Sequence, residues 1–443
     1  MSTSSHAILL SRIADRTAHA GVIGLGYVGL PLAIAIARKG FTVTGFDIDP
    51  GKIVAIDAGR SYIEAVGDDV LSAERDAGRF SATVDFDGLA ACDVIVICVP
   101  TPLTRHRDPD LTYIVKTCQE IALRLRPGQL VVLESTTYPG TTTDVVRPIL
   151  AATGLDIGAE VFLGFSPERE DPGNRDFSTT SIPKIVAGDG DAAAQAMEAF
   201  YSAVVERVVP VSTTATAEAV KLTENIFRAV NIALVNELKT VFEAMGIDIW
   251  EVIDAAKTKP FGYMPFYPGP GLGGHCIPID PFYLTWKSRE YEMPTRFIEL
   301  AGEINSAMPR HVVGRLAEAL DMHLGKALSR SRVLIIGLAY KKNVPDIRES
   351  PSLKLIELIE ERGGSASFHD PHVDEIPRTR EYLSLKGRRS VPLSALSGFD
   401  AVLVATDHDN VDYALIAEQA PLVIDTRNVF ARRGIAGGLI VKA

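Results

Sequence analysis

The sequence is poor in features that mark several classes of protein. Only four of its 443 residues are cysteine (Cys92, Cys98, Cys118 and Cys276), with no CxxC pair and no metal-ligand spacing. The first three lie in apolar surroundings and are predicted to be core residues. No apolar run approaches the roughly 20 residues that cross a bilayer, and residues 1–5 lack the start of a signal peptide. We therefore expect a cytoplasmic protein in a reducing compartment, with no membrane partner and no metal site.

Positive charge is also scarce. Lys and Arg number 45 against 56 Asp and Glu, which gives a net charge of −11. This balance argues against bulk attraction to nucleic acid or to an anionic membrane. An anionic substrate would need a local cluster of Lys and Arg. The chain is 47% hydrophobic and 23% charged, which is typical of a globular protein, and is long enough for two or three domains.

The first half of the chain, from residue 20 to about residue 210, alternates short apolar segments with helical ones. This alternation is typical of βαβ units, in which helices cover both faces of a parallel sheet. The predicted strands are 21–23, 42–46, 94–99, 130–133, 161–165 and 184–187.

The second half begins with a long helix, predicted from its apolar spacing to run from about Ala215 to Met245. A helix at 250–257, a Pro/Gly-rich stretch at 260–280 and a helix at about 294–324 follow. After Lys326 the βα pattern restarts, with predicted strands at 332–336, 366–369, 401–405 and 422–425 and a helix at 352–361. These patterns place domain boundaries near residues 211 and 325.

A glycine-rich stretch at 269–274 is followed closely by Cys276 and Asp280. Glycines there allow close approach of the backbone to a neighbour. A thiol in such a loop is placed for covalent chemistry, because cysteine forms thiohemiacetals and thioesters with carbonyl carbons. By itself, the loop could equally be a packing turn around a buried, inert cysteine.

A dinucleotide-binding pattern occupies the other end of the chain. The segment Gly24-Leu25-Gly26-Tyr27-Val28-Gly29 follows an apolar strand and opens an apolar helix. This context gives a tight turn, a close approach to a pyrophosphate and a helix N-terminus directed at it. A purely structural turn is the alternative. The pattern predicts an N-terminal Rossmann domain at 1–211, and with the second α/β region the fold class is α/β.

Asp47 ends the second predicted strand, 18 residues after Gly29. A carboxylate at this position accepts hydrogen bonds from both ribose hydroxyls and repels a 2′-phosphate, which favours NAD over NADP. Asp47 could instead be a solvated turn residue.

Two further loops follow predicted strands, where ligands of open α/β sheets bind. The first contains Val99, Pro100 and Thr101, and the second contains Ser135 and Thr136. We expect both to line the nicotinamide side of the cleft. The alternative is that each is a polar turn.

Six blocks of sequence occur in an order that resembles the UDP-sugar 6-dehydrogenase family over nearly the whole chain. The run 259–268 most resembles UDP-N-acetylglucosamine 6-dehydrogenases, with UDP-N-acetylmannosamine dehydrogenases close behind. The six blocks are 24–29, 134–139, 166–169, 221–225, 273–280 and 337–350.

The resemblance implies a four-electron oxidation of the sugar C6 alcohol to a carboxylate, with two NAD+ reduced in succession. Cys276 would trap the intermediate aldehyde as a thiohemiacetal, and a second oxidation would leave a thioester for water to hydrolyse. It implies a central helical connector at 212–325 that carries the cysteine loop. It also implies a Rossmann-like UDP-binding domain at 326–443, consistent with an incomplete glycine pattern at Gly337.

Lys221 and Asn225 lie four residues apart and so share one face of the long helix. An ammonium and an amide there could stabilise an alkoxide or a thiohemiacetal oxyanion. Without the family, a solvated polar pair is the favoured alternative. Asp280 could activate the hydrolytic water, or Asp280-Pro281 could be a helix-entry turn.

Two more residues complete the expected catalytic set. Thr137 could hold a water near the C6 oxygen. Glu168, at the end of a strand, is a candidate general base.

Several residues are expected at the substrate. Lys341 or Lys342 with Arg348 resembles the family's contacts to the UDP group, and Arg427 follows a strand end. These cations could also be ordinary surface charge. The remaining substrate-binding candidates from the resemblance are Arg169, Tyr267 and Gly273.

The chain departs from the pattern of UDP-glucose dehydrogenases at two positions. Pro172 replaces a usual carboxylate, and Tyr267 replaces a usual lysine. UDP-glucose is therefore less favoured as the substrate. The family's inter-subunit arginine has no obvious match; Lys257 or Lys259 could serve instead.

Two other functions stay open. A two-electron hydroxyacid-type dehydrogenase would need neither the cysteine nor the second α/β domain. A non-catalytic nucleotide-sugar sensor would not need Lys221, Asn225, Cys276 and Asp280 together. By resemblance we also expect a homo-oligomer, a dimer around the long helix.

Overall fold

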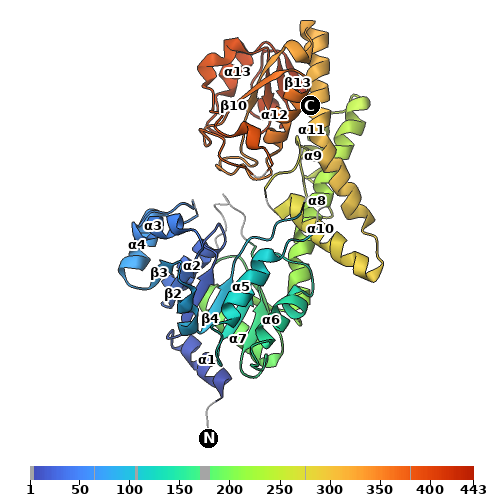
Figure 1. The fold of residues 1–443 in the computed structure, drawn as a ribbon. Helices are drawn as coiled ribbons and strands as arrows, with labels where there is room; N and C mark the ends of the chain where they lie inside the picture. The colour runs from blue at the N-terminus through green and yellow to red at the C-terminus, as the bar shows by residue number, and fades with distance from the viewer. Residues whose placement is uncertain (1–3, 64, 105–107, 170–179, 275, 380) are drawn as a thin grey trace. The chain divides into compact units, whose positions relative to one another are not determined.

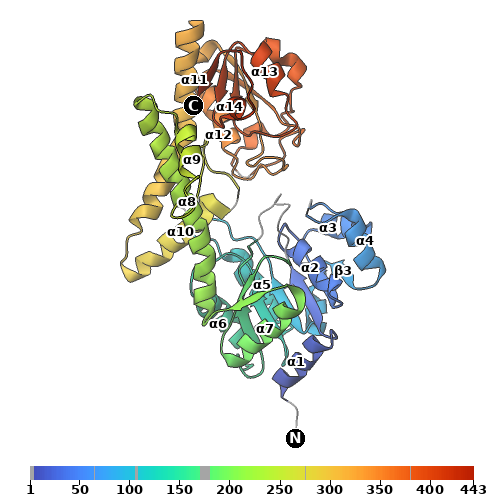
Figure 2. The ribbon, with the colours of Figure 1, turned by 180° about the vertical axis from the view of Figure 1, so that it is seen from behind.

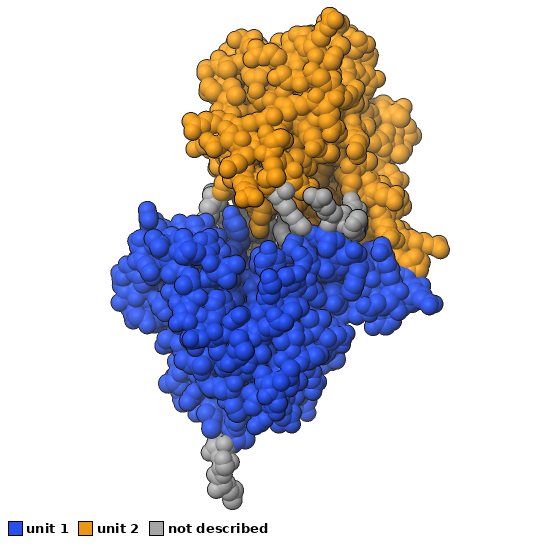
Figure 3. All heavy atoms as spheres, in the orientation of Figure 1, with its two compact units in different colours: residues 1–224, 282–293 blue, residues 225–281, 294–443 orange. Residues whose placement is uncertain are grey.

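The computed structural model describes residues 4–63, 65–104, 108–169, 180–274, 276–379 and 381–443, and for Cys276 the backbone alone. The chain divides into two compact units, residues 1–224 with 282–293 and residues 225–281 with 294–443 (Figure 3). Two of the three divisions fall inside helices, α8 (Thr214–Ala244) and α10 (Cys276–Ser288), and the third lies between residues 293 and 294. The three-domain division at residues 211 and 325 stays a prediction.

The first unit is built on an eight-stranded sheet with the order β3-β2-β1-β4-β5-β6-β7-β8 (Figure 1). Neighbouring strands are parallel except for β6 and β7, which are antiparallel. The strands are β1 (His19–Ile23), β2 (Thr42–Phe46), β3 (Phe80–Thr83), β4 (Val94–Ile97), β5 (Leu130–Leu133), β6 (Phe162–Phe165), β7 (Lys184–Gly188) and β8 (Val208–Pro210).

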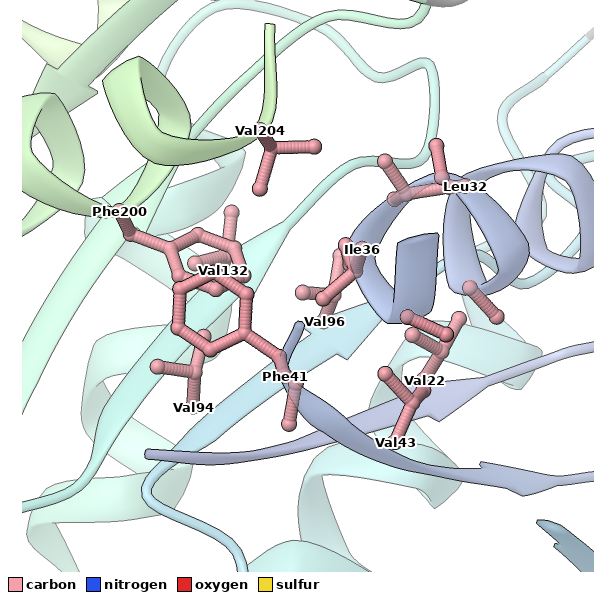
Figure 4. Packing of buried hydrophobic residues seen from close by; sticks show 14 of the residues in the cluster. Val22, Leu32, Ile36, Phe41, Val43, Val94, Val96, Val132, Phe200 and Val204 are labelled. Carbon is pink, nitrogen blue, oxygen red and sulfur yellow. The ribbon is translucent and has the colours of Figure 1, made fainter. Parts of the chain in front are cut away.

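Both faces of this sheet are buried, which is why its strands are apolar at nearly every position. On one face, alternate residues such as Val22, Val43 and Val94 pack against α1 (Ser5–Ala14), α2 (Gly29–Arg38) and α7 (Asp191–Val204) (Figure 4). The other face packs against α5 (Thr112–Ala122) and α6 (Arg147–Ala151). Two short helices, α3 (Pro50–Asp57) and α4 (Asp68–Asp76), lie between β2 and β3 in the chain.

The second unit contains a five-stranded parallel sheet with the order β10-β9-β11-β12-β13. Its strands are β9 (Arg332–Ile336), β10 (Ser365–His369), β11 (Ala401–Val404), β12 (Val423–Asp425) and β13 (Ile440–Lys442). One face packs against α11 (Arg296–Leu324) and α12 (Pro351–Glu361) (Figure 2). The other packs against α13 (Tyr413–Gln419) and α14 (Val429–Arg432). A further helix, α9 (Ile249–Ala256), follows α8.

Most predicted elements are confirmed, within one to two residues at their ends. The structure differs at five places. It adds strands β3, β8 and β13, and it turns β7 antiparallel to β6. It also forms α10 from Cys276 onward, where the sequence predicted a loop. Asp280 and Pro281 therefore lie inside a helix, and their interpretation as a helix-entry turn is wrong.

The described helices include none that is both long enough and apolar enough to span a membrane.

Candidate active site

The glycine-rich turn after β1 has the geometry of a dinucleotide site. Gly24 has φ +91°, which a side chain would strain, and a Cβ at Gly29 would lie 1.9 Å from the carbonyl oxygen of Gly24. A Cβ at Gly26 would meet no atom within 4 Å, so this part of the turn faces open space. Val28, the N-cap of α2, makes no side-chain cap hydrogen bond. The Leu30 amide donates to the Gly26 carbonyl at 3.2 Å and Pro31 has no N–H, so an anion such as a pyrophosphate would be favoured here by the positive end of α2 and the open backbone of the turn.

Asp47 is buried and ordered beside this turn. Its carboxylate accepts hydrogen bonds from the Leu25 amide at 2.8 Å and from the Lys52 ammonium at 2.7 Å. The interpretation of Asp47 as a solvated turn residue is therefore wrong. The glycine turn and the carboxylate together fit the pyrophosphate and the adenine ribose of a dinucleotide. The ring of Tyr27 is exposed on the same turn.

The two loops expected near the nicotinamide lie at the same sheet edge, because β1, β4 and β5 are parallel neighbours. The Ser135 hydroxyl donates to the carbonyl oxygen of Val99 at 2.7 Å, which ties the loops together. Pro100 is exposed and Thr136 half-buried. Thr101 is buried, and its carbonyl accepts from the Tyr283 hydroxyl at 2.8 Å. These loops are ordered by specific hydrogen bonds.

Thr137 carries a buried hydroxyl that has no hydrogen-bond partner among the described residues. Buried polar atoms are nearly always paired with protein, water or a ligand. This oxygen could accept a water or a substrate hydroxyl, and the role expected for Thr137 stays a prediction.

Glu168, Arg169 and Lys221 come together in the first unit. The Lys221 ammonium donates to the Glu168 carbonyl oxygen, and the Arg169 amide donates to the Glu168 carboxylate at 2.6 Å. The Arg169 guanidinium pairs with Glu224 at 2.6 Å. Lys221 is buried, so the prediction of a solvated polar pair is wrong for it.

Asn225 and Asp280 come together in the second unit, joining α8 to α10. The Asn225 amide nitrogen donates to the Asp280 carboxylate, and the Asn225 oxygen accepts from Arg228. Both Asn225 and Asp280 are fully buried, so Asn225 is not a solvated residue on a helix flank. Cys276 is the first residue of α10, and its side chain lies outside the described part of the chain.

The glycines before Cys276 are required by packing within the second unit. A Cβ at Gly273 would lie 2.4 Å from the Tyr340 Cβ, and Gly274, with φ +80°, lies against the Tyr340 ring. The Gly274 amide donates to the Arg348 carbonyl at 2.9 Å. The loop therefore fits closely onto the segment that carries the predicted UDP contacts. Packing therefore explains why these two positions are glycine. It does not decide whether Cys276 is inert or reactive.

The predicted substrate cations of the second unit differ in their surroundings. Lys342 pairs with Asp409 at 2.7 Å, and Arg348 pairs with Asp346 at 2.6 Å. Lys341 is half-buried. The Arg427 guanidinium donates through Nε to the Ala405 carbonyl at 2.7 Å and packs against Gly269. Arg427 is thus held at the start of the glycine-rich loop.

Tyr267 and the nearby lysines make a separate exposed cluster. The Tyr267 hydroxyl donates to Asp254 at 2.7 Å, and Lys257 pairs with the same carboxylate at 2.6 Å. Lys259 lies over the Phe261 ring. Pro172, the other departure from UDP-glucose dehydrogenases, lies outside the described residues.

Sequence reasoning missed a buried ionic group beside Glu168. Lys184 forms ion pairs with Glu134 and Glu168, and all three side chains are largely buried. The one signal in the sequence was a lysine opening an otherwise apolar strand, Lys184-Ile185-Val186-Ala187. It also missed Glu218, whose carboxylate accepts from the Gly140 and Thr142 amides; burial raises its pKa to about 7.

The fold and this site define an NAD-dependent dehydrogenase with a second nucleotide-binding domain. Family models match three consecutive segments, each described as part of the UDP-glucose/GDP-mannose dehydrogenase family: the NAD binding domain (residues 18–205), the central domain (215–307) and the UDP binding domain (334–432). The chain belongs to this family, and it is an NAD-dependent UDP-sugar dehydrogenase. The predicted family, fold class and cofactor are confirmed.

Three relatives illustrate the similarity. The UDP-N-acetyl-D-glucosamine 6-dehydrogenase of Pseudomonas aeruginosa is 36% identical, over 87% of this chain and 90% of its own. The solved UDP-D-ManNAc dehydrogenase of Pyrococcus horikoshii is 34% identical with a TM-score of 0.87, over 96% and 98% of the two chains. A solved UDP-glucose dehydrogenase of Pyrobaculum islandicum is 27% identical with a TM-score of 0.83, over 96% of both.

Proposed function

We propose that this enzyme oxidises the C6 hydroxyl of a UDP-N-acetylhexosamine, with UDP-N-acetylglucosamine the favoured substrate, to the corresponding uronate. The observation that carries the proposal is the buried Asn225–Asp280 contact, which ties α8 to α10. Asp280 lies four residues after Cys276 in α10, so the two residues are one turn apart on the helix. A nucleophile, a carboxylate and an amide thus belong to one small region of the second unit.

Cys276 is the proposed nucleophile for the second half of the reaction. Its sulfur would form a bond to C6 of the intermediate aldehyde, and the carbonyl oxygen would take up a proton, which gives a thiohemiacetal. Loss of a hydride and a proton from this adduct leaves a thioester. Its place at the start of α10 favours the thiolate, because a helix N-terminus stabilises negative charge nearby.

Asp280 is the proposed base for hydrolysis of the thioester. Its carboxylate would accept a proton from water while the water oxygen bonds to C6 and the C6–sulfur bond breaks. Asn225 holds the Asp280 carboxylate through one N–H of its amide, and the second N–H of the same nitrogen would be the donor to an oxyanion.

The first unit would supply the groups for the initial oxidation of the alcohol. We propose that Glu168, or a water on it, accepts the hydroxyl proton, that Lys221 stabilises the alkoxide, and that Thr137 holds a water or the C6 oxygen. When bound, NAD+ would supply the acceptor for the hydride. The cofactor would be held by Gly24, Gly26, Tyr27, Val28, Gly29 and Asp47, with Val99, Pro100, Thr101, Ser135 and Thr136 at the nicotinamide.

The UDP group would be bound by Lys341, Lys342, Arg348 and Arg427 of the second unit. Arg169, Tyr267 and Gly273 complete the proposed substrate set. The N-acetylated sugar is supported by the names of the relatives, which include UDP-N-acetyl-D-glucosamine and UDP-N-acetyl-D-mannosamine enzymes. It is also supported by Tyr267 standing where UDP-glucose dehydrogenases usually carry lysine.

We further propose a homodimer formed through α8. Three large apolar side chains on this helix, Phe227, Leu234 and Val241, are spaced by seven residues and about half exposed. A seven-residue repeat of apolar side chains is typical of paired helices. Sedimentation of the wild type at twice the monomer mass, with a shift toward monomer in Leu234→Glu, is the expected result.

The reaction is tested by the ratio of NADH formed to sugar nucleotide consumed. Wild type and Cys276→Ser are compared with UDP-N-acetylglucosamine, its C2 epimer and UDP-glucose. A ratio near two with UDP-N-acetylglucosamine, with acid formation lost in the variant, is expected. Activity confined to the epimer would change the substrate alone. A ratio near one that the substitution leaves unchanged would contradict the proposal and point to a two-electron dehydrogenase.

A further inference from the structure

A buried ammonium group lies between two carboxylates at the end of the first sheet. Because β7 is antiparallel to β6, its first residue, Lys184, lies at the edge where the parallel strands end. Glu134 follows β5 and Glu168 follows β6 at the same edge. The antiparallel direction of β7 therefore places Lys184 beside Glu134 and Glu168, which follow β5 and β6.

The contacts in this group are specific. Lys184 Nζ pairs with Glu134 Oε1 and lies 3.4 Å from Glu168 Oε2. The other Glu134 oxygen, Oε2, accepts from the Tyr201 hydroxyl of α7 at 2.5 Å. Glu134 is thus held from both sides, whereas Glu168 has the longer contact to the ammonium. The two carboxylates compete for one positive charge.

Other groups that face this cluster come from α7, α8 and the end of β4. Burial raises the pKa of the Tyr201 phenol and of the Cys98 thiol well above their usual values, so both stay neutral. Lys221 of α8 contacts the Glu168 carbonyl oxygen, and the Arg169 guanidinium is paired with Glu224. Lys184 therefore places a cation in direct contact with the Glu168 carboxylate, 3.4 Å from Oε2.

The protonation of Glu134 is also set by its position. Burial raises its pKa to about 6, against the opposite effect of the Lys184 ammonium, while the second carboxylate acts in the same direction as burial. The carboxylates raise the pKa of Lys184, although burial alone would lower it. The ammonium stays charged, and the number of protons on the two carboxylates is the quantity that varies.

We propose that Lys184 and Glu134 are positioning residues that set the charge of Glu168: Lys184 holds Glu168 as a carboxylate ready to accept a proton, and Glu134 weakens that effect by competing for the same ammonium. This inference rests on the proposed role of Glu168. In the step it serves, the O–H bond of the C6 hydroxyl breaks, its proton passes to a Glu168 oxygen directly or through one water, and the hydride leaves C6 for NAD+.

Substituting the two residues in turn gives effects of opposite sign. In Glu134→Gln, Lys184 serves Glu168 alone, so Glu168 stays ionised to lower pH. The acidic limb of the pH profile of kcat/KM should move to lower pH by roughly half a unit to one unit. In Lys184→Met the carboxylates lose their cation, and the limb should move to higher pH by about one unit or more.

Asp189→Asn is the matched control, because Asp189 forms an exposed ion pair with Arg147 elsewhere in the same unit. Its acidic limb should coincide with that of the wild type. Should Lys184→Met fail to fold, the double variant Glu134→Gln/Lys184→Met takes its place and should lie at higher pH than Glu134→Gln alone. Shifts of the same sign in both substitutions, or equal loss of activity at every pH, would overturn the proposal.

A second measurement separates this proposal from the proposed function. Glu134 has a raised pKa in the folded state, so its linked contribution to stability is present below about pH 4.5 and is lost as the pH rises through about 6. Urea unfolding of the wild type should show this trend, and Glu134→Gln should not. If no UDP-sugar is oxidised, the proposed function fails, and the unfolding data alone test the competition between the two carboxylates for Lys184. The same pH dependence of the free energy of unfolding in the wild type and in Glu134→Gln would overturn that competition.

Discussion

The turn that follows β1 in the first sheet and the turn that follows β9 in the second have the same backbone geometry but different surroundings. In the first, Gly24 has φ +91° and the next amide, Leu25, donates to Asp47 at the end of the neighbouring strand. In the second, Gly337 has φ +86° and the next amide, Leu338, donates to Asp370 at the end of its neighbouring strand.

The turns diverge after their first residue. In the first unit α2 begins five residues after Gly24, and its N-terminus has no side-chain cap. In the second unit α12 begins fourteen residues after Gly337, at Pro351, and Ser350 caps it by accepting from the Ser352 amide. The first helix begins at an open turn without a side-chain cap, although its Leu30 amide donates to the Gly26 carbonyl and its third residue, Pro31, has no N–H. The other begins with a residue that has no N–H and satisfies the next amide internally.

Asp47 and Asp370, the carboxylates beside the two turns, also differ in how fully the protein satisfies them. Asp370 accepts from four backbone amides and lies 3.1 Å from the His408 imidazole. Burial would raise its pKa, but these hydrogen bonds outweigh burial and hold the pKa below its usual value. Asp47 is paired with one lysine side chain at the open turn. We propose that the same strand–turn–strand unit binds the cofactor in the first unit, whereas in the second it orders the loop that carries the proposed UDP contacts.

The largest expected effect comes from filling the first turn. Gly29→Val would place a side chain within 2 Å of the Gly24 carbonyl oxygen, so the turn and the start of α2 must move. We expect NAD binding to weaken at least about 100-fold, measured by titration calorimetry. Gly337→Ala fills the second turn instead, with its Cβ 2.4 Å from the Thr406 carbonyl oxygen. It should destabilise the second unit by about 1–3 kcal/mol and leave NAD affinity unchanged. Equal loss of NAD affinity in both would break the comparison.

A smaller effect is expected from the carboxylates. Asp47→Asn should weaken NAD binding about 10-fold, because a hydrogen bond to a charged group contributes roughly 1.5–3 kcal/mol, and should narrow the preference for NAD over NADP. Asp370→Asn should lower the free energy of unfolding by a similar amount without changing cofactor preference. Competitive binding of NAD and NADP measures the cofactor preference of Asp47→Asn, and urea unfolding measures the stability of Asp370→Asn. A cofactor preference unaffected by Asp47→Asn would contradict the assignment of this residue to the ribose.

One buried lysine from each unit, Lys184 and Lys239, offers a third comparison. Lys184 is paired, whereas the Lys239 ammonium on α8 is buried with no hydrogen-bond partner in the described residues, and burial lowers its pKa to about 8. The pKa of Lys239 is lower in the folded protein than in the unfolded chain. Burial of its charged form therefore destabilises the fold most below pH 8, and this destabilisation declines as the pH rises toward 10. Lys239→Met should stabilise the protein by about 1–2 kcal/mol at pH 7. The gain should shrink at pH 10 in urea unfolding, and a loss of stability at pH 7 would show that a partner holds the ammonium.

The smallest expected effect comes from the cap of α12. Ser350→Ala should destabilise the second unit by about 1 kcal/mol, because it leaves the Ser352 amide without its acceptor. NAD affinity should not change. Thermal unfolding gives the first quantity and calorimetry the second. An altered NAD affinity would show that the two nucleotide sites are not independent in their local structure.

The sequence predicts most of this fold because its strands are apolar on both faces and its helices have clear periodicity. It predicts the wrong start for α10, because a glycine run and the prolines at 278 and 281 indicate a loop. Gly273 and Gly274 are explained by close packing against Tyr340 and Pro351 and by the positive φ of Gly274, which the sequence does not show. Strand order is also beyond local pattern, so nothing along the chain shows that β7 is reversed and that Lys184 meets Glu134. Asp47 and the glycine turn could be predicted, because both belong to one βαβ unit whose spacing is recognisable in the sequence.

The central claim, a thioester on Cys276, is tested most directly by mass spectrometry of Asp280→Asn quenched in acid during turnover. Slowed hydrolysis should let the adduct accumulate. The peptide that contains Cys276 should then gain the mass of the sugar nucleotide less four hydrogens, and Cys276→Ser should gain nothing. An Asp280→Asn protein that still releases acid at the wild-type rate, or that shows no adduct on this peptide while NADH accumulates, would contradict the account.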